Sequence, residues 1–231
     1  AALKSLHAAS RAVAESTAQS VQRALKARSV RLLVCGGECP GSGGEDYLRL
    51  DSVESFDPQR GAWEPLPSMT EPRFLSSAAV VGGRPCVCGG VSDELGVLNS
   101  VECFNPSALV WEPLPAMARR RAGSAAVALG GHLFVCGGHD DYDGRRYLRT
   151  VESLCLLGDA AGDFSNDATW EVAPPMSLPR DRLAVAVVTG LICACGGNDG
   201  QEYLSSTERL LAPSAREEAH PWEPWAPMAH R

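Results

Sequence analysis

Arginine is the residue type whose spacing in this chain most suggests binding chemistry. Arg73, Arg121 and Arg180 each follow a methionine by four positions, and Arg182 adds a further guanidinium beside the last of them. A guanidinium presents its N–H donors in a planar fork that matches a carboxylate or a phosphate. Arginines gathered at one surface would therefore favour acidic or phosphorylated ligands. Because three of them recur at one spacing, a structural role for those three is an equally good interpretation.

The usual catalytic and metal-binding patterns find little support. The five histidines form neither an HxxxH nor an HxH set, which are spacings that favour a metal site. No G-x-S-x-G nucleophile motif is present. The glycine-rich stretch 40–44 is not followed by the Lys-Ser/Thr of a phosphate-binding loop. We therefore predict a protein that is not an enzyme and that needs no metal or other cofactor.

Nine cysteines raise the question of disulfides and zinc. Cys86 and Cys193 occupy a position that holds Leu33 and Phe134 elsewhere, so this position favours apolar bulk. Free cysteine behaves as a small buried hydrophobic residue. We predict buried, reduced thiols and hence a reducing, cytoplasmic compartment, with disulfide or zinc roles as the alternatives. Four further cysteines share one position, directly before a Gly-Gly pair: Cys35, Cys88, Cys136 and Cys195.

These Gly-Gly pairs belong to a sequence unit that is repeated four times. Each pair is followed by Val-Glu or Thr-Glu, then by Trp-Glu, and then by a Met six residues after the Trp. A period of about 50 residues with a Gly-Gly and a Trp in each unit indicates propeller blades. Residues needed once per blade are most simply structural. They are Gly36, Gly37, Gly89, Gly90, Gly137, Gly138, Gly196 and Gly197, and Trp63, Trp111, Trp170 and Trp222.

Each unit predicts four short antiparallel strands. The first strand is rich in Ser, Ala and Gly, and small residues suit the crowded inner end of a blade. The fourth strand carries the Trp, which can fill the wide outer wedge between blades. Two insertions, at 158–168 and 212–220, are rich in polar and small residues, and we predict that both are solvated loops.

The order Gly-Gly, Val-Glu, Trp and Met-x-x-x-Arg resembles the kelch repeat family over about residues 31–231. The resemblance implies an all-β fold, a kelch-type β-propeller of four-stranded antiparallel blades. In this register, 31–72 is a partial first blade, 73–120 and 121–179 are full blades, and 180–231 is a fourth blade with the start of the next. Kelch rings commonly have about six blades, so we predict an incomplete ring of about four. A closed four-bladed ring is the alternative.

Residues 1–30 do not carry the repeat. Leu3, Leu6, Val13, Val21 and Leu25 lie on a background of Ala, Ser, Lys and Arg. This pattern predicts a short amphipathic N-terminal helix that serves as a lead-in or linker. A transit-type targeting peptide is the alternative, since arginine and serine are common here and acidic residues are rare.

The resemblance also suggests where a ligand would bind. In kelch proteins that recruit peptides, the position of the recurring arginine and the two positions after it contribute to the binding face. Of the matching residues, Arg182 is the strongest candidate because it has no counterpart in the other units. The candidates at these positions are Arg73, Phe74, Arg121, Arg180, Asp181 and Arg182.

The loops after the Gly-Gly pairs differ in every unit, and variable loops on a fixed scaffold commonly carry recognition. Candidate contacts in these loops are Tyr142, Arg145, Asn198 and Gln201, with plain solvated turns as the alternative.

The bulk properties and the resemblance together define an expected function. The net charge of −7 disfavours a nucleic-acid partner, and no apolar run approaches the ~20 residues of a membrane-spanning helix. The resemblance implies binding of a protein or peptide ligand, with acidic ligands favoured by the arginines. The commonest such role is substrate recognition in kelch-like adaptors of cullin-based ubiquitin ligases, with the cullin bound through a separate domain. Actin binding or scaffolding is the alternative, and a kelch-fold oxidase is a third.

Overall fold

The computed structural model describes residues 31–41, 47–141, 143, 146–157, 164, 168–211 and 222–230. Every regular element in these ranges is a β-strand, which confirms the predicted all-β class. No helix long and apolar enough to cross a membrane occurs among these residues. The predicted N-terminal helix at 1–30 lies outside the described residues.

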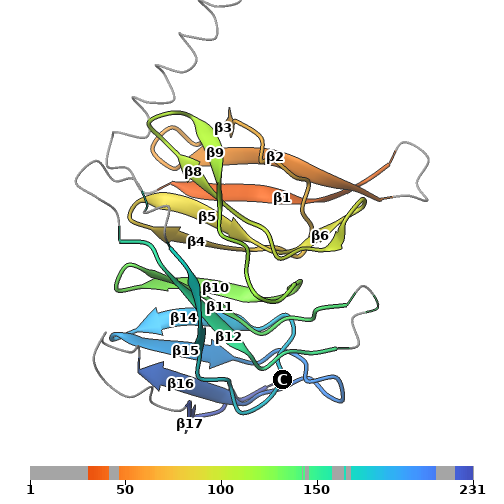
Figure 1. Cartoon of the computed structure of the whole chain (residues 1–231), viewed down its shortest axis with the longest axis vertical. Coiled ribbons are helices and arrows are strands. Elements are labelled where there is room, and N and C mark those ends of the chain that lie inside the picture. The colour runs from red at the N-terminus through yellow and green to blue at the C-terminus, as the bar shows by residue number, and fades with distance from the viewer. Residues whose placement is uncertain are drawn as a thin grey trace, which may run out of the picture.

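Four antiparallel sheets follow one another along the chain, and Figure 1 shows them arranged in chain order along the long axis. The first sheet has three strands: β1 (Leu32–Pro40), β2 (Tyr47–Asp57) and β3 (Ala62–Leu66). The second sheet has four: β4 (Ser77–Val81), β5 (Arg84–Cys88), β8 (Val101–Asn105) and β9 (Val110–Leu114). A short ribbon in the loop between β5 and β8 contains β6 (Val91–Ser92) and β7 (Gly96–Val97).

The third and fourth sheets repeat the plan of the second. The third contains β10 (Ala125–Leu129), β11 (His132–Cys136), β12 (Val151–Cys155) and β13 (Trp170–Ala173). The fourth contains β14 (Ala184–Val188), β15 (Leu191–Cys195), β16 (Thr207–Leu211) and β17 (Glu223–Trp225). In each of the last three sheets the strands lie side by side in chain order. The predicted four-stranded antiparallel blades are therefore confirmed.

The Gly-Gly pairs are required by both backbone conformation and space. Gly137 and Gly138 have φ values of 66° and 88°, which side chains rarely tolerate. A Cβ atom on Gly137 would also collide with the carbonyl oxygen of Arg180, and one on Gly138 would collide with that of Ala122. Glycine is thus the residue that lets the second strand end against the loop that enters the next sheet.

Four apolar clusters form the core among the described residues, and three of them lie between two consecutive sheets. The largest joins Val81, Val101 and Met117 to Leu133 and Leu154 across the second and third sheets. The other two join the third sheet to the fourth and the first sheet to the second. Each blade therefore buries its faces against its neighbours, as expected for a repeat architecture.

The recurring tryptophans tie neighbouring sheets together. Trp111 and Trp222 are buried, and each indole N–H donates to a proline carbonyl of the preceding unit. The Nε1···O distances are 2.9 Å for Trp111–Pro67, 2.7 Å for Trp170–Pro115 and 2.8 Å for Trp222–Pro174. The fourth tryptophan differs, since 47% of the Trp63 surface is exposed.

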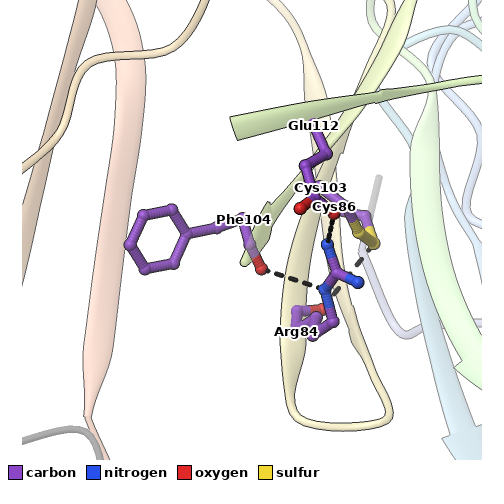
Figure 2. Close-up of a disulfide and its surroundings, with 5 residues drawn as sticks. All are labelled: Arg84, Cys86, Cys103, Phe104 and Glu112. Carbon is purple, nitrogen blue, oxygen red and sulfur yellow. Dashed lines mark hydrogen bonds and ion pairs between the residues drawn. A yellow bond between two sulfur atoms is a disulfide. The ribbon is translucent and has the colours of Figure 1, made fainter. Parts of the chain in front are cut away.

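One pair of cysteines departs from the predicted reduced thiols. Cys86 on β5 lies directly opposite Cys103 on β8, and the two form a disulfide (Figure 2). The prediction was wrong for this pair because it compared cysteines along a single strand. It did not consider which residue lies opposite each cysteine on the neighbouring strand. A disulfide is uncommon in reducing compartments. The pairing therefore gives no support to the predicted cytoplasmic location, which stays a prediction.

The cysteines that precede the Gly-Gly pairs are free thiols in the structure. Burial raises the pKa of Cys35 to about 11. Burial also raises the pKa of Cys88 and of Cys136 to about 12. These three thiols are therefore protonated at neutral pH.

The insertion at 158–168 is not wholly a solvated loop. Phe164 and Ala168 pack against the cluster between the second and third sheets, and the Arg84 guanidinium lies 4.5 Å from the centre of the Phe164 ring. The prediction failed because it weighed the many polar residues of the insertion above its single aromatic residue. The remainder of this insertion, and the insertion at 212–220, lie outside the described residues.

Candidate functional site

The three recurring arginines are buried rather than displayed on the surface. Arg73, Arg121 and Arg180 each expose no more than 1% of their surface. Each pairs with the glutamate of its own Val-Glu or Thr-Glu dipeptide. The N···O distances are 3.0 Å for Arg73–Glu102, 2.9 Å for Arg121–Glu152 and 2.9 Å for Arg180–Glu208. The structure therefore corrects their assignment to the binding face, because buried and paired guanidinium groups are not available to a ligand.

Further hydrogen bonds make each arginine a link between parts of its blade. Arg121 Nη1 donates to the carbonyl oxygens of Gly137 and Thr150 at 2.8 Å and 2.9 Å. Its partner Glu152 also accepts a bond of 2.7 Å from the backbone N–H of Ala118. Buried ion pairs are stable only when such additional bonds satisfy the charged groups. The network fixes the loop that leads into each first strand, and so it positions the residues that follow the arginine.

The two predicted sets of loops lie side by side at one end of the sheets. Antiparallel strands reverse direction at each connection, so the loop after the second strand and the loop into the first strand emerge at the same end. Backbone bonds join them directly. The Phe74 N–H donates to the Val91 carbonyl at 3.0 Å, and the Asp181 N–H donates to the Asn198 carbonyl at 2.8 Å.

A pocket of about 730 Å³ opens between these loops, and residues of all four units line it. We call it the mouth pocket. It brings together four of the predicted binding residues: Phe74, Asp181, Arg182 and Asn198. Gln201 is exposed and is not among the lining residues. Tyr142 and Arg145 lie outside the described residues.

Charged groups of the mouth pocket differ in how far they are already engaged. Asp181 is buried, and its Oδ1 lies 2.8 Å from His139 Nδ1. Arg182 exposes 67% of its side chain, and its closest carboxylate oxygen among the described residues is on Asp181, 3.6 Å away. Arg49 is held by Asp93 at 3.0 Å. Arg182 is therefore the cation in this pocket that is most available to a ligand.

The backbone at Arg182 is in an unusual conformation. Its φ is 53°, and Leu75 at the corresponding position of the second unit has a φ of 55°. Residues with a side chain rarely adopt this left-handed region, and they are enriched at functional sites. Hydrogen bonds maintain it here: Gly123 N–H donates to the Leu75 carbonyl at 2.9 Å, and Arg182 N–H donates to the Gly123 carbonyl at 2.7 Å.

Sequence reasoning missed five charged or aromatic residues of the mouth pocket: Arg49, His139, Asp143, Tyr147 and Tyr203. A signal for three of them was present in the repeat. Arg49, Tyr147 and Tyr203 each precede a leucine and stand four positions before the Val-Glu or Thr-Glu dipeptide. A position that recurs in register and carries large side chains on the same loop could have been identified as part of the lining.

Comparison with known proteins agrees with this architecture. No curated protein matches the sequence. Among solved structures, that of the bacterial protein YjhT superposes with a TM-score of 0.69 at 16% sequence identity. The match covers 86% of this chain and 68% of YjhT, and at this identity it shows the fold alone.

The repeats themselves identify the family. The sequence model described as "Kelch motif" matches residues 31–70, 72–118 and 120–177. These ranges cover more than half of the chain and correspond to the first three sheets. The fourth sheet repeats the same strand order and the same Arg–Glu and Trp–Pro contacts. The chain therefore belongs to the kelch motif family.

Proposed function

We propose that this kelch protein is a protein-binding module that holds a segment of another protein in the mouth pocket. The observation that carries the proposal is the convergence of loops from all four units on one pocket of about 730 Å³. Pockets of this size with a few convergent polar groups are the usual form of a binding site. The Arg–Glu pairs hold these loops in place before a ligand arrives. Binding therefore costs little conformational entropy.

The chemistry of the lining favours a peptide ligand with an acidic group. Arg182 offers a largely exposed guanidinium, which can hold a carboxylate or a phosphate through two parallel hydrogen bonds. Phe74, Tyr147 and Tyr203 add aromatic surface around it. Arginine and tyrosine are the residues that most often dominate the binding energy of protein interfaces.

The biological role that we propose is substrate recognition of the kind found in kelch-like adaptors of cullin-based ubiquitin ligases. What supports this role is membership of the family together with a pocket suited to a peptide. The cullin itself would be contacted by a separate domain. Identification of the proteins that this chain binds tests the proposed role.

The decisive experiment is quantitative affinity capture with the wild-type protein and Arg182→Glu. Arg60→Glu is a matched control, because Arg60 exposes the same 67% of its side chain but lies in the β2–β3 turn at the opposite end of the first sheet. We expect partners that are lost with Arg182→Glu and kept with Arg60→Glu. Equal capture by both variants would show that binding does not use the mouth pocket.

A further inference from the structure

The outer strand of each blade has a free edge, and in three blades a proline blocks it. β3, β9, β13 and β17 each pair with one strand only among the described residues. Pro65, Pro113 and Pro224 lie opposite the recurring glutamate of the neighbouring strand. Because proline has no N–H, it fits an edge strand where the N–H would face away from the sheet, and it prevents a further strand from pairing there.

The third blade carries a valine at this position. Val172 lies opposite Glu152 in the same register, so its N–H also faces away from the sheet. In an antiparallel ladder the C=O of such a residue faces the same way. Among the described residues, no hydrogen bond from outside the sheet reaches either group, and 80% of the Val172 surface is exposed. β13 therefore has an open edge that the other outer strands lack.

The glutamate beside this open edge also lacks the partner that its counterparts have. In the other three blades the glutamate of the Trp-Glu dipeptide pairs with an arginine. These pairs are Arg31–Glu64 at 3.0 Å, Arg84–Glu112 (Figure 2) and Arg209–Glu223 at 3.3 Å. The exposed Glu171 has no ion pair or hydrogen bond among the described residues. His132 stands where the first two blades have their arginine, so the third blade lacks this cation.

We propose that β13 is a docking edge for an extended segment of a separate, basic protein. The backbone of this segment pairs with the N–H and C=O of Val172, as in other cases of strand addition. A lysine or arginine of the segment lies opposite Glu171, and the adjacent β-branched residue lies opposite Val172. Because successive residues of a strand face opposite sides, the segment alternates basic and apolar residues. The net charge of −7 favours the approach of such a partner.

A second copy of this chain fits the edge less well. Antiparallel pairing of β13 with itself about Val172 places Ala173, and not a cation, opposite Glu171. The four-residue strand also buries far less than the ~1,000 Å² expected of a stable protein interface. The edge is suited instead to a transient contact with a basic peptide segment. No residue of β13 lines the mouth pocket, so this inference goes beyond the proposed function.

The probe is a short synthetic peptide with blocked ends that alternates lysine and valine, titrated into the ¹⁵N-labelled whole chain. We expect saturable shifts of the NMR amide signals of β13. Glu171→Gln should weaken binding about two- to fivefold, the range of an exposed ion pair. The matched control is Glu223→Gln, which changes the exposed glutamate at the same position of the fourth sheet and should leave binding unchanged.

The repeat itself supplies the variant that closes the edge. Val172→Pro introduces the residue that three other blades tolerate at this position, so the free energy of unfolding should change little while peptide binding is lost. Val172→Thr keeps the N–H and should bind as the wild type does. Glu171→Lys does not alter the backbone, and it should reverse the preference from the lysine peptide to a peptide that alternates glutamate and valine.

Several results would overturn the proposal. They are an absence of β13 shifts with the lysine peptide, equal binding by Val172→Pro, and no change of preference in Glu171→Lys. Shifts at β13 that depend on protein concentration without peptide would assign the edge to a second copy and would also overturn it. Arg182→Glu should not affect this peptide, so the mouth pocket and the β13 edge can each fail alone.

Discussion

The guanidinium of Arg121 lies 2.9 Å from the carboxylate of Glu152 with neither side chain exposed by more than 3%. The same contact recurs in two other blades, and in each the arginine also donates to the first glycine of the Gly-Gly pair. One ion pair therefore holds the second strand, the third strand and the loop between blades. The mouth pocket is built on the loops that these pairs fix.

Breaking one of these pairs should destabilise the fold strongly. In Arg121→Ala, Glu152 remains as a buried charge without its partner, and such a loss typically costs about 3–5 kcal/mol. We expect the free energy of unfolding, measured by urea denaturation, to fall by about this amount. Arg60→Ala is the control, since changes to exposed side chains usually stay within about 0.5 kcal/mol. A loss for Arg121→Ala no larger than that of the control would contradict a structural role.

Repetition in the sequence made the scaffold predictable, but it did not reveal which of the recurring side chains are buried and which are exposed. The Gly-Gly and Trp positions recur because each blade needs one tight turn and one large wedge, so their period indicated the fold directly. Arg121 recurs for the same reason, yet an arginine can lie in a core or on a rim, and only burial separates the two. Tyr147 lines the mouth pocket because two loops that are distant in the sequence meet there, which requires the folded sheets.

Replacing Arg182 by glycine should raise stability while it reduces ligand binding. The φ of 53° at this residue costs an amino acid with a side chain roughly 1–2 kcal/mol, and glycine avoids this cost. Glycine also increases the entropy of the unfolded chain, so we expect a net gain of up to about 1 kcal/mol in the free energy of unfolding. Thermal unfolding of Arg182→Gly and of Arg60→Gly checks this, because the control residue does not have a positive φ and should lose stability. A loss for Arg182→Gly as large as for the control would show that the backbone is not strained there.

The disulfide between Cys86 and Cys103 should contribute measurably to stability. It closes a loop with a sequence separation of 17 residues, and cross-links of this length typically contribute about 3 kcal/mol by restricting the unfolded chain. We expect reductant or Cys103→Ser to lower the melting temperature. Serine is a suitable replacement because Ser55 and Ser153 occupy the same position in other units. Cys155→Ser, which changes an exposed free thiol, is the control. An intact mass showing that both cysteines alkylate without reduction would contradict the cross-link.

The buried thiols predict how the protein responds to alkaline pH. Burial raises the pKa of Cys88 and of Cys136 from 9.0 to about 12, so the folded state keeps protons that the unfolded state loses. Their contribution to stability is therefore complete below pH 9 and is lost as pH rises toward 12. Because the thiolate is the reactive form, both thiols should resist iodoacetamide at pH 8.5 in the folded protein and react after denaturation in urea. Peptide mapping by mass spectrometry checks this against the exposed Cys155. Cys88 labelling as fast as Cys155 in the folded protein would show that the interface between the blades is open to solvent.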